Sequence, residues 1–103
     1  MQTVSGKLPF GMKVAESIHQ DFEIREPLVD DMVEAEKTVP PTELHAFNIE
    51  MLTRVTVRVG NFEGPFTAGM FRRLKRPDYN ALVQAMMQAD NLGKPQQDGE
   101  AAI

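Results

Sequence analysis

The chain has 103 residues, of which 42% are hydrophobic and 25% charged, and its formal net charge is −4. This length predicts one globular domain, and no apolar run approaches the roughly 20 residues that a membrane-spanning helix needs. Without cysteine the chain can form neither disulfides nor thiolate metal sites, and its N-terminus lacks the apolar segment of a secretory signal. We therefore expect a cytosolic protein without a membrane partner.

An alternating pattern near the N-terminus predicts a β-hairpin. Its apolar positions are Leu8, Phe10, Met12, Val14, Ile18, Phe22 and Ile24. Pro9 cannot donate to a β-ladder and Gly11 weakens one, so we expect the first strand at a sheet edge, with a bulge. A lone hairpin is only marginally stable in water, so it must pack against helices. Residues 1–5 show no pattern and are expected to fray.

Pro27 marks the point where a strand pattern gives way to a helix pattern. The residues before it alternate with a period of two, and the apolar residues after it recur at helical spacing. A proline disfavours helical geometry for its predecessor, here Glu26. Asp30 and Asp31 place negative charge in the first helical turn, where the unpaired N–H groups and the macrodipole favour it. We therefore expect a corner between strand and helix at Pro27.

The pair Pro40-Pro41 ends this helix, and Thr42 is a suitable N-cap for a second one. The apolar stripe of the second helix is Leu44, Phe47, Met51, Leu52 and Val55. The β-branched residues that follow alternate like a strand, yet they continue a helical pattern without a breaker before Gly60. We favour helix to about Val57.

Two glycines and a proline predict a loop over residues 60–65, after which Thr67 can cap a short helix. The last helix has Asp78 near its start and Gly93 as its C-cap. The remaining residues are polar and aperiodic, as in a disordered tail. The sequence thus predicts an α+β domain over residues 1–93, with an N-terminal β-hairpin packed on three to four α-helices, and a disordered tail over residues 94–103.

Few residues suggest chemistry. His19 and His45 have no acidic or cysteine neighbour at ligand spacing, so we expect neither a metal site nor a cofactor. On a helix the side chains of Asp30 and Asp31 diverge by about 100° and cannot work as a general acid and base. We expect no enzymatic activity.

Charge is distributed unevenly along the chain. Residues 16–36 contain eight acidic residues and one arginine, a net −7, whereas residues 54–76 contain six basic residues and one glutamate, a net +5. These segments are either two solvated faces of one monomer or complementary surfaces for self-association or a charged partner.

The chain has seven methionines, several of them on apolar helical stripes. Filling of the core is their ordinary role, and the alternative is an adaptable surface for apolar partner helices. The candidate partner-binding residues on these stripes are Met51, Val55, Met86 and Met87.

The order of several short motifs resembles the tail assembly chaperone family of Mu-like tailed phages, over residues 6–92. The motifs are Phe22-Glu23-Ile24-Arg25-Glu26-Pro27, Asp30-Asp31 before residues 32–37, Met51-Leu52-Thr53-Arg54, and Leu74 followed by Pro77-Asp78-Tyr79 and Leu82. The resemblance implies a protein of the host cytoplasm, absent from the mature virion, that coats the tape measure protein until the tail tube polymerises around it. Many such proteins also have an extended form made by ribosomal frameshifting.

The residues matched to the family have no chemical role. Arg25, Glu26 and Pro27 are expected to hold the corner, where Asp31 supports the helix start. Asp78 is expected to support the start of the last helix and Tyr79 its packing. Opposed charges predict a homo-oligomer.

Two alternatives remain open. The basic stretch Arg72–Arg76 lies between two helices and could form the helix-turn-helix of a small DNA-binding regulator. The negative net charge and the few base-reading side chains of the last helix argue against a nucleic-acid partner. The other alternative is a minor structural protein of the virion.

Overall fold

Three strands and four helices make up residues 2–92, the part of the chain that the computed structural model describes. They follow one another as β1 (Thr3–Val14), β2 (Ser17–Arg25), α1 (Val29–Glu36), α2 (Leu44–Val55), β3 (Thr56–Val59), α3 (Ala68–Arg72) and α4 (Arg76–Ala89). The predicted α+β architecture, a hairpin with four helices, is confirmed. The expected C-cap at Gly93 and the tail 94–103 lie outside the described residues.

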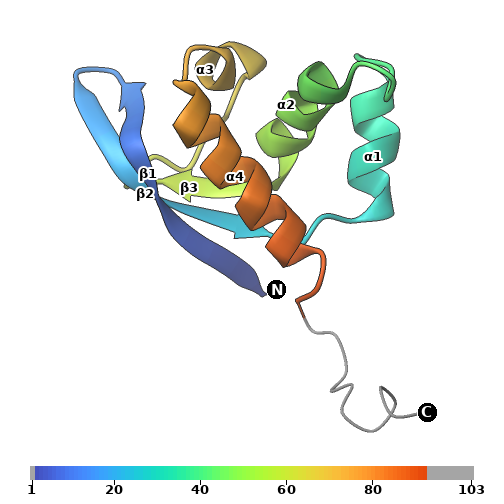
Figure 1. The fold of residues 1–103 in the computed structure, drawn as a ribbon, viewed down its shortest axis with the longest axis horizontal. Coiled ribbons are helices and arrows are strands. Elements are labelled where there is room, and N and C mark those ends of the chain that lie inside the picture. The colour runs from blue at the N-terminus through green and yellow to red at the C-terminus, as the bar shows by residue number, and fades with distance from the viewer. Residues whose placement is uncertain (1, 93–103) are drawn as a thin grey trace, which may run out of the picture.

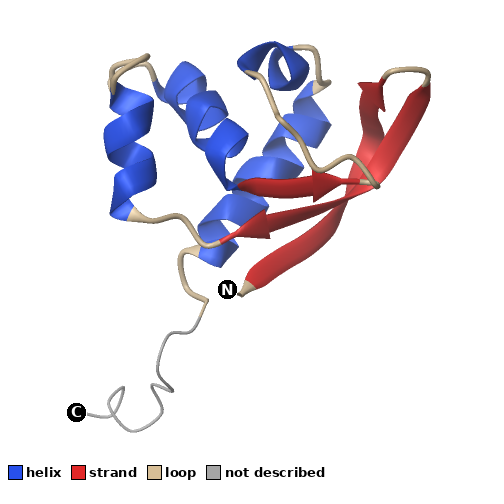
Figure 2. Cartoon of the chain, turned by 180° about the vertical axis from the view of Figure 1, so that it is seen from behind, coloured by secondary structure: helices blue, strands red, loops and turns tan. Residues whose placement is uncertain are grey.

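The helices lie on one side of a three-stranded antiparallel sheet, and α4 crosses it (Figures 1 and 2). The hairpin turn and α1 stand at opposite ends of the domain (Figure 1). Between the layers, the largest fully buried apolar side chains are Phe71, Leu8, Met12, Ile24, Leu52, Leu82, Val55 and Val59. Burial of these side chains from both layers is the main free-energy gain that holds helices to sheet.

The hairpin forms as predicted, with β1 at the sheet edge and a shift of register between Lys7 and Met12. Gly11, within this bulge, has φ +103°, a conformation that glycine adopts without strain. The expected fraying of residues 1–5 is wrong for the described ones. Thr3 pairs with Arg25 across the ladder, and its hydroxyl donates to Glu23 Oε2 at 2.6 Å.

The segment after α2 differs from the prediction that the second helix continues to about Val57. The helix ends at Val55, and Thr56–Val59 is a strand, not the continuation of a helix to Val57. Val59 pairs with Phe22 of β2, and both side chains are buried. The β-branched residues gain a ladder partner and a buried face from β2, which outweighs the helical pattern preceding them.

The helix starts agree in part with the sequence. Pro27 lies between β2 and α1, and Thr67 occupies the N-cap position of α3. Thr42 does not cap α2, because Glu43 occupies that position and residues 41–43 form a turn and bend. The N–H of Glu43 donates to the carbonyl of Pro40, so the turn after the prolines delays the helix by a residue.

Asp78 ties α4 to the bulge of β1. It is fully buried, and its Oδ1 accepts the backbone N–H of Phe10 at 2.9 Å. Since the bulge removes this N–H from the ladder, the carboxylate supplies the acceptor it would otherwise lack. On the other side of the bulge, Gln20 Nε2 donates to the carbonyl of Leu8 at 3.2 Å. Asp78 therefore bonds to a strand, a contact that its place at a helix start did not reveal.

We predict that Asp78→Ala lowers the free energy of unfolding by about 2 kcal/mol, because it leaves the Phe10 N–H without an acceptor. Asp90→Ala, an exposed position just beyond α4, should change it by less than about 0.5 kcal/mol. Urea unfolding followed by circular dichroism measures both. Equal losses in the two variants would show that the bond to the bulge contributes nothing.

Candidate functional site

An open groove of about 510 Å³ runs between α1, α2 and α4. We call it the methionine groove; it is lined by Pro27, Leu28, Val29, Met32, Leu44, Phe47, Asn48, Met51, Val83, Met86, Met87 and Asp90. Ten of these twelve residues are apolar, and the polar ones are Asn48 and Asp90.

The groove has an exposed rim and a buried floor. On the rim, the exposed fraction is 75% for Val29, 60% for Leu44 and 58% for Met87. On the floor, Met51 is 6% exposed and Met86 is 8% exposed. The rim side chains leave apolar surface in water that a partner could cover, and the unbranched methionines allow the surface to adapt to different partners.

The structure brings three of the four predicted partner-binding residues to this groove. Met51 comes from α2, whereas Met86 and Met87 come from α4. Met51 and Met86 are buried core residues that line the groove only as its floor. Val55 is fully buried in the core and does not line the groove. Met87 alone of the four is freely exposed.

Sequence reasoning missed the residues of the α1 wall. Leu28, Val29 and Met32 fit a helical core stripe, yet each is about half exposed or more. The shortness of α1 was the one sign in the sequence that these residues would stay partly exposed. A helix of two turns with polar residues on one side packs chiefly on α2 and cannot bury its whole apolar stripe.

Asp31 positions this wall. Its two carboxylate oxygens accept Arg25 Nη1 and Nη2 at 2.8 Å each, the backbone N–H of Leu28 at 2.8 Å and Arg54 Nε at 3.1 Å. The side chain of Asp31 is 3% exposed. Hydrogen bonding from Arg25 lowers the pKa of Asp31 from 3.8 to about 2, with further contributions from Leu28 and Arg54. The end of β2, the start of α1 and the end of α2 therefore meet at one carboxylate.

Tyr79 joins the other two walls. Its hydroxyl lies 2.8 Å from His45 Nδ1 and accepts the side-chain amide of Asn48 at 3.3 Å. Both partners belong to α2, so Tyr79 fixes α4 against α2 where Asn48 lines the groove. Glu26 and Pro27 complete the corner, where the carbonyl of Glu26 accepts Arg25 Nη1 at 3.0 Å.

Other kinds of site find little support in residues 2–92. In that range no group of three or more His, Asp or Glu side chains could hold a metal ion. No helix there is long and apolar enough to cross a membrane. An amphipathic helix can lay its apolar face into an open apolar groove between helices.

Comparison with known proteins identifies the family. The family described as tail assembly protein gp41 matches residues 8–100, and the chain belongs to this family of phage tail assembly proteins. No curated protein and no solved structure matches the chain. The predicted resemblance to a tail assembly family of Mu-like phages is thus confirmed.

We predict that Asp31→Asn lowers the free energy of unfolding by about 2 kcal/mol or more at pH 7, because the partly buried guanidinium groups of Arg25 and Arg54 lose their anionic partner. The pKa of Asp31 is lower in the folded state, so its contribution is complete above about pH 5. It should be lost as the pH falls through about 4 toward 2. In urea unfolding between pH 7 and pH 2, the free energies of unfolding of the wild type and of Asp31→Asn should become equal as the pH falls. A difference independent of pH would contradict the assignment.

A second prediction separates the groove floor from its rim. Met51→Asp should destabilise the fold by about 4 kcal/mol or more, since it places an unpaired charge in the core, whereas Met87→Asp should cost less than about 0.5 kcal/mol. Thermal unfolding of both variants measures this. A large loss in Met87→Asp would mean that this side chain is packed.

Proposed function

We propose that this tail assembly protein is a non-catalytic chaperone that binds helical segments of the tape measure protein in the methionine groove. It keeps that protein soluble in the host cytoplasm until the tail tube polymerises around it, and it is absent from the mature virion. The family supports a role in tail assembly, and the groove supplies a surface of the right chemistry.

The exposed apolar rim of the groove carries the proposal. An amphipathic helix that lays its apolar face into such a groove would cover Val29, Leu44 and Met87, which water otherwise surrounds. A tape measure protein offers many different apolar segments, so its chaperone must accept varied side chains. Flexible, polarisable methionines on the floor and rim suit this lack of strict shape selection.

Size determines the stoichiometry. A helix rises 1.5 Å per residue, so a partner helix that crosses the 29 Å dimension of the domain would have about 20 residues covered. A tape measure helix of hundreds of residues would therefore bind many copies of this chain.

Co-expression with the cognate tape measure protein tests the proposal. The wild-type chain should keep that protein soluble and co-purify with it in many-to-one ratio. The double variant Val29→Asp/Met87→Asp changes two exposed rim residues and should lower the co-purified amount by about tenfold or more, because two desolvated carboxylates oppose binding. The matched control Val57→Asp changes an exposed valine of β3 outside the groove and should bind as wild type.

Three results would overturn parts of the proposal. If the double variant binds as well as the control, the groove is not the site. If the tape measure protein is equally soluble without this chain, the chaperone role is wrong. If mass spectrometry finds the chain in purified particles, it is a structural component of the virion.

A further inference from the structure

A smaller pocket of about 300 Å³ lies between α2, α3 and the first turns of α4. We call it the arginine pocket; it is lined by His45, Ile49, Phe71, Arg72, Leu74, Arg76, Tyr79 and Asn80. It shares no residue with the methionine groove. However, the Tyr79 hydroxyl, on the pocket side, accepts the side-chain amide of Asn48, which lines the groove. The two cavities are therefore neighbours across this hydrogen bond.

One stripe of α4 runs through both cavities. At 100° per residue, the residues that α4 contributes to them fall within an arc of about 120°. They are Arg76, Tyr79 and Asn80 in the arginine pocket, and Val83, Met86 and Met87 in the methionine groove. A partner helix that lies along this stripe therefore contacts the apolar groove with one part and the arginine pocket with the next.

The arginine pocket carries positive charge that the domain does not neutralise. Arg72 and Arg76 are both exposed, and neither forms a salt bridge among residues 2–92. No residue that lines the pocket is acidic. The acidic residue in the first turn of α4, Asp78, is fully buried and accepts the backbone N–H of Phe10 instead. Both guanidinium groups are thus available to an anionic partner.

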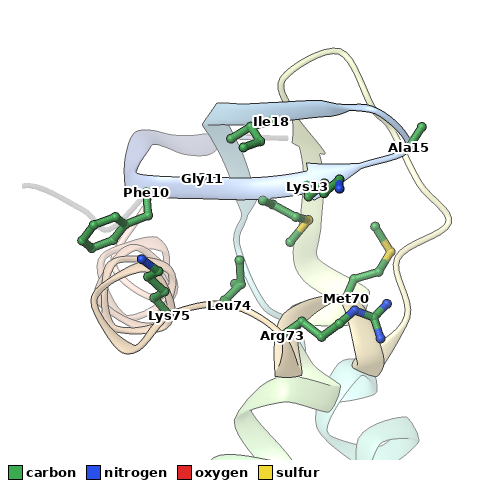
Figure 3. A pocket seen from close by; sticks show the side chains of 10 residues that line it. Phe10, Gly11, Lys13, Ala15, Ile18, Met70, Arg73, Leu74 and Lys75 are labelled. Carbon is green, nitrogen blue, oxygen red and sulfur yellow. The ribbon is translucent and has the colours of Figure 1, made fainter.

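The neighbouring cations line a different cavity. Arg73 and Lys75 border a cleft of about 560 Å³ between the hairpin and α3, together with Lys13 of β1 (Figure 3). Neither Arg72 nor Arg76 lines this cleft, and none of its three cations lines the arginine pocket. The basic stretch between α3 and α4 therefore supplies two separate surfaces, and changes in one can serve as controls for the other.

We propose that Arg72 and Arg76 are specificity-determining residues of the partner site, and that they select helical segments with an acidic end. This proposal rests on the groove-binding function proposed above. Arg76 and Met86 are ten residues apart on α4, so about 15 Å separates the arginine pair from the groove floor. The favoured partner helix therefore carries apolar anchors and, about three turns away, carboxylates. Arginine suits this contact because its planar fork can bind a carboxylate through two hydrogen bonds.

Charge also sets the direction in which the partner helix lies. Asp90 lines the methionine groove just beyond the C-terminus of α4, at the end of the stripe opposite to Arg76. A helix whose acidic end lay beside Asp90 would meet like charge, whereas the reverse direction pairs opposite charges. Successive copies on one long helix would therefore all face the same way.

A nucleic acid fits these surfaces poorly. Two arginines can contact few phosphates, and the stripe continues into a groove whose lining is apolar rather than basic. An amphipathic helix with an acidic end matches both the apolar and the cationic part of the stripe.

Binding of three synthetic peptides to the purified full-length chain tests the proposal. Each peptide is a helix of about 20 residues with the same leucine stripe at one end, and three positions about three turns away are Glu, Gln or Lys. In about 0.05 M salt, the Glu peptide should bind wild type about tenfold more tightly than the Lys peptide, with the Gln peptide between them. In about 0.5 M salt the difference should shrink, because exposed charges are screened. Fluorescence anisotropy measures the affinities.

Charge reversal of the arginine pair gives the decisive measurement. Arg72→Glu/Arg76→Glu should reverse the order, so that the Lys peptide binds most tightly, which a loss of folding cannot produce. The matched control Lys13→Glu/Arg73→Glu makes the same change in net charge at the neighbouring cleft and should keep the wild-type order. Val29→Asp/Met87→Asp should weaken all three peptides, because it changes the groove itself.

The outcomes separate this proposal from the groove. Equal affinities of the three peptides for wild type, or a reversed order in the control, would overturn the selection by the arginine pair and leave the groove as the site. If Val29→Asp/Met87→Asp weakens no peptide, or if no peptide binds wild type, the groove is refuted as well. Binding of a DNA duplex of about 20 base pairs in about 0.15 M salt, lost in Arg72→Glu/Arg76→Glu, would assign the pair to a nucleic acid and overturn the proposal.

Discussion

The carboxylate of Asp31 is the contact on which the arrangement of the domain depends. It accepts hydrogen bonds from Arg25 at the end of β2, from the backbone at Leu28 and from Arg54 near the end of α2. Burying a charge to 3% exposure is costly unless it is paired and hydrogen-bonded, and the Asp31 carboxylate is both. These bonds hold the start of α1 beside the ends of β2 and α2, and α1 supplies one wall of the methionine groove.

The methionine groove has apolar side chains that the domain does not bury. α1 packs chiefly on α2, which leaves part of its apolar surface exposed, and α4 packs on the sheet and bonds to β1 through Asp78. Apolar side chains therefore remain at the rim while the methionines beneath them complete the core. A surface of this kind is costly to a monomer and useful to a protein that works bound to another chain.

The charged residues of the chain fall into two groups: some form ion pairs within the domain, and others are exposed to water. Those close to the β2 corner pair internally and link β2 to α1 and β3, and α1 to α2, where partial burial strengthens the attraction. Those at the ends of the domain stay in water, where they add little to stability but can direct association. The net charge of a segment thus includes residues that pair within the domain and residues that are exposed on its surface. Only the three-dimensional structure distinguishes the two groups.

Local patterns were sufficient for the elements whose determinants are neighbours in the chain. The hairpin with its bulge at Gly11, the corner at Pro27 and the loop after Gly60 depend on side-chain alternation and on the limited conformations of glycine and proline. Whether Val59 belongs to a helix or a strand was decided by Phe22, far away in sequence, which supplies the strand partner. Likewise, a helical stripe of methionines has the same sequence pattern whether its side chains form the groove floor, the groove rim or the core. The packing of α1, α2 and α4 decided that Val55 is buried, that Met51 forms the groove floor and that Met87 stays exposed to water. The sequence could not show this, because the burial of a side chain depends on which distant segments pack against it.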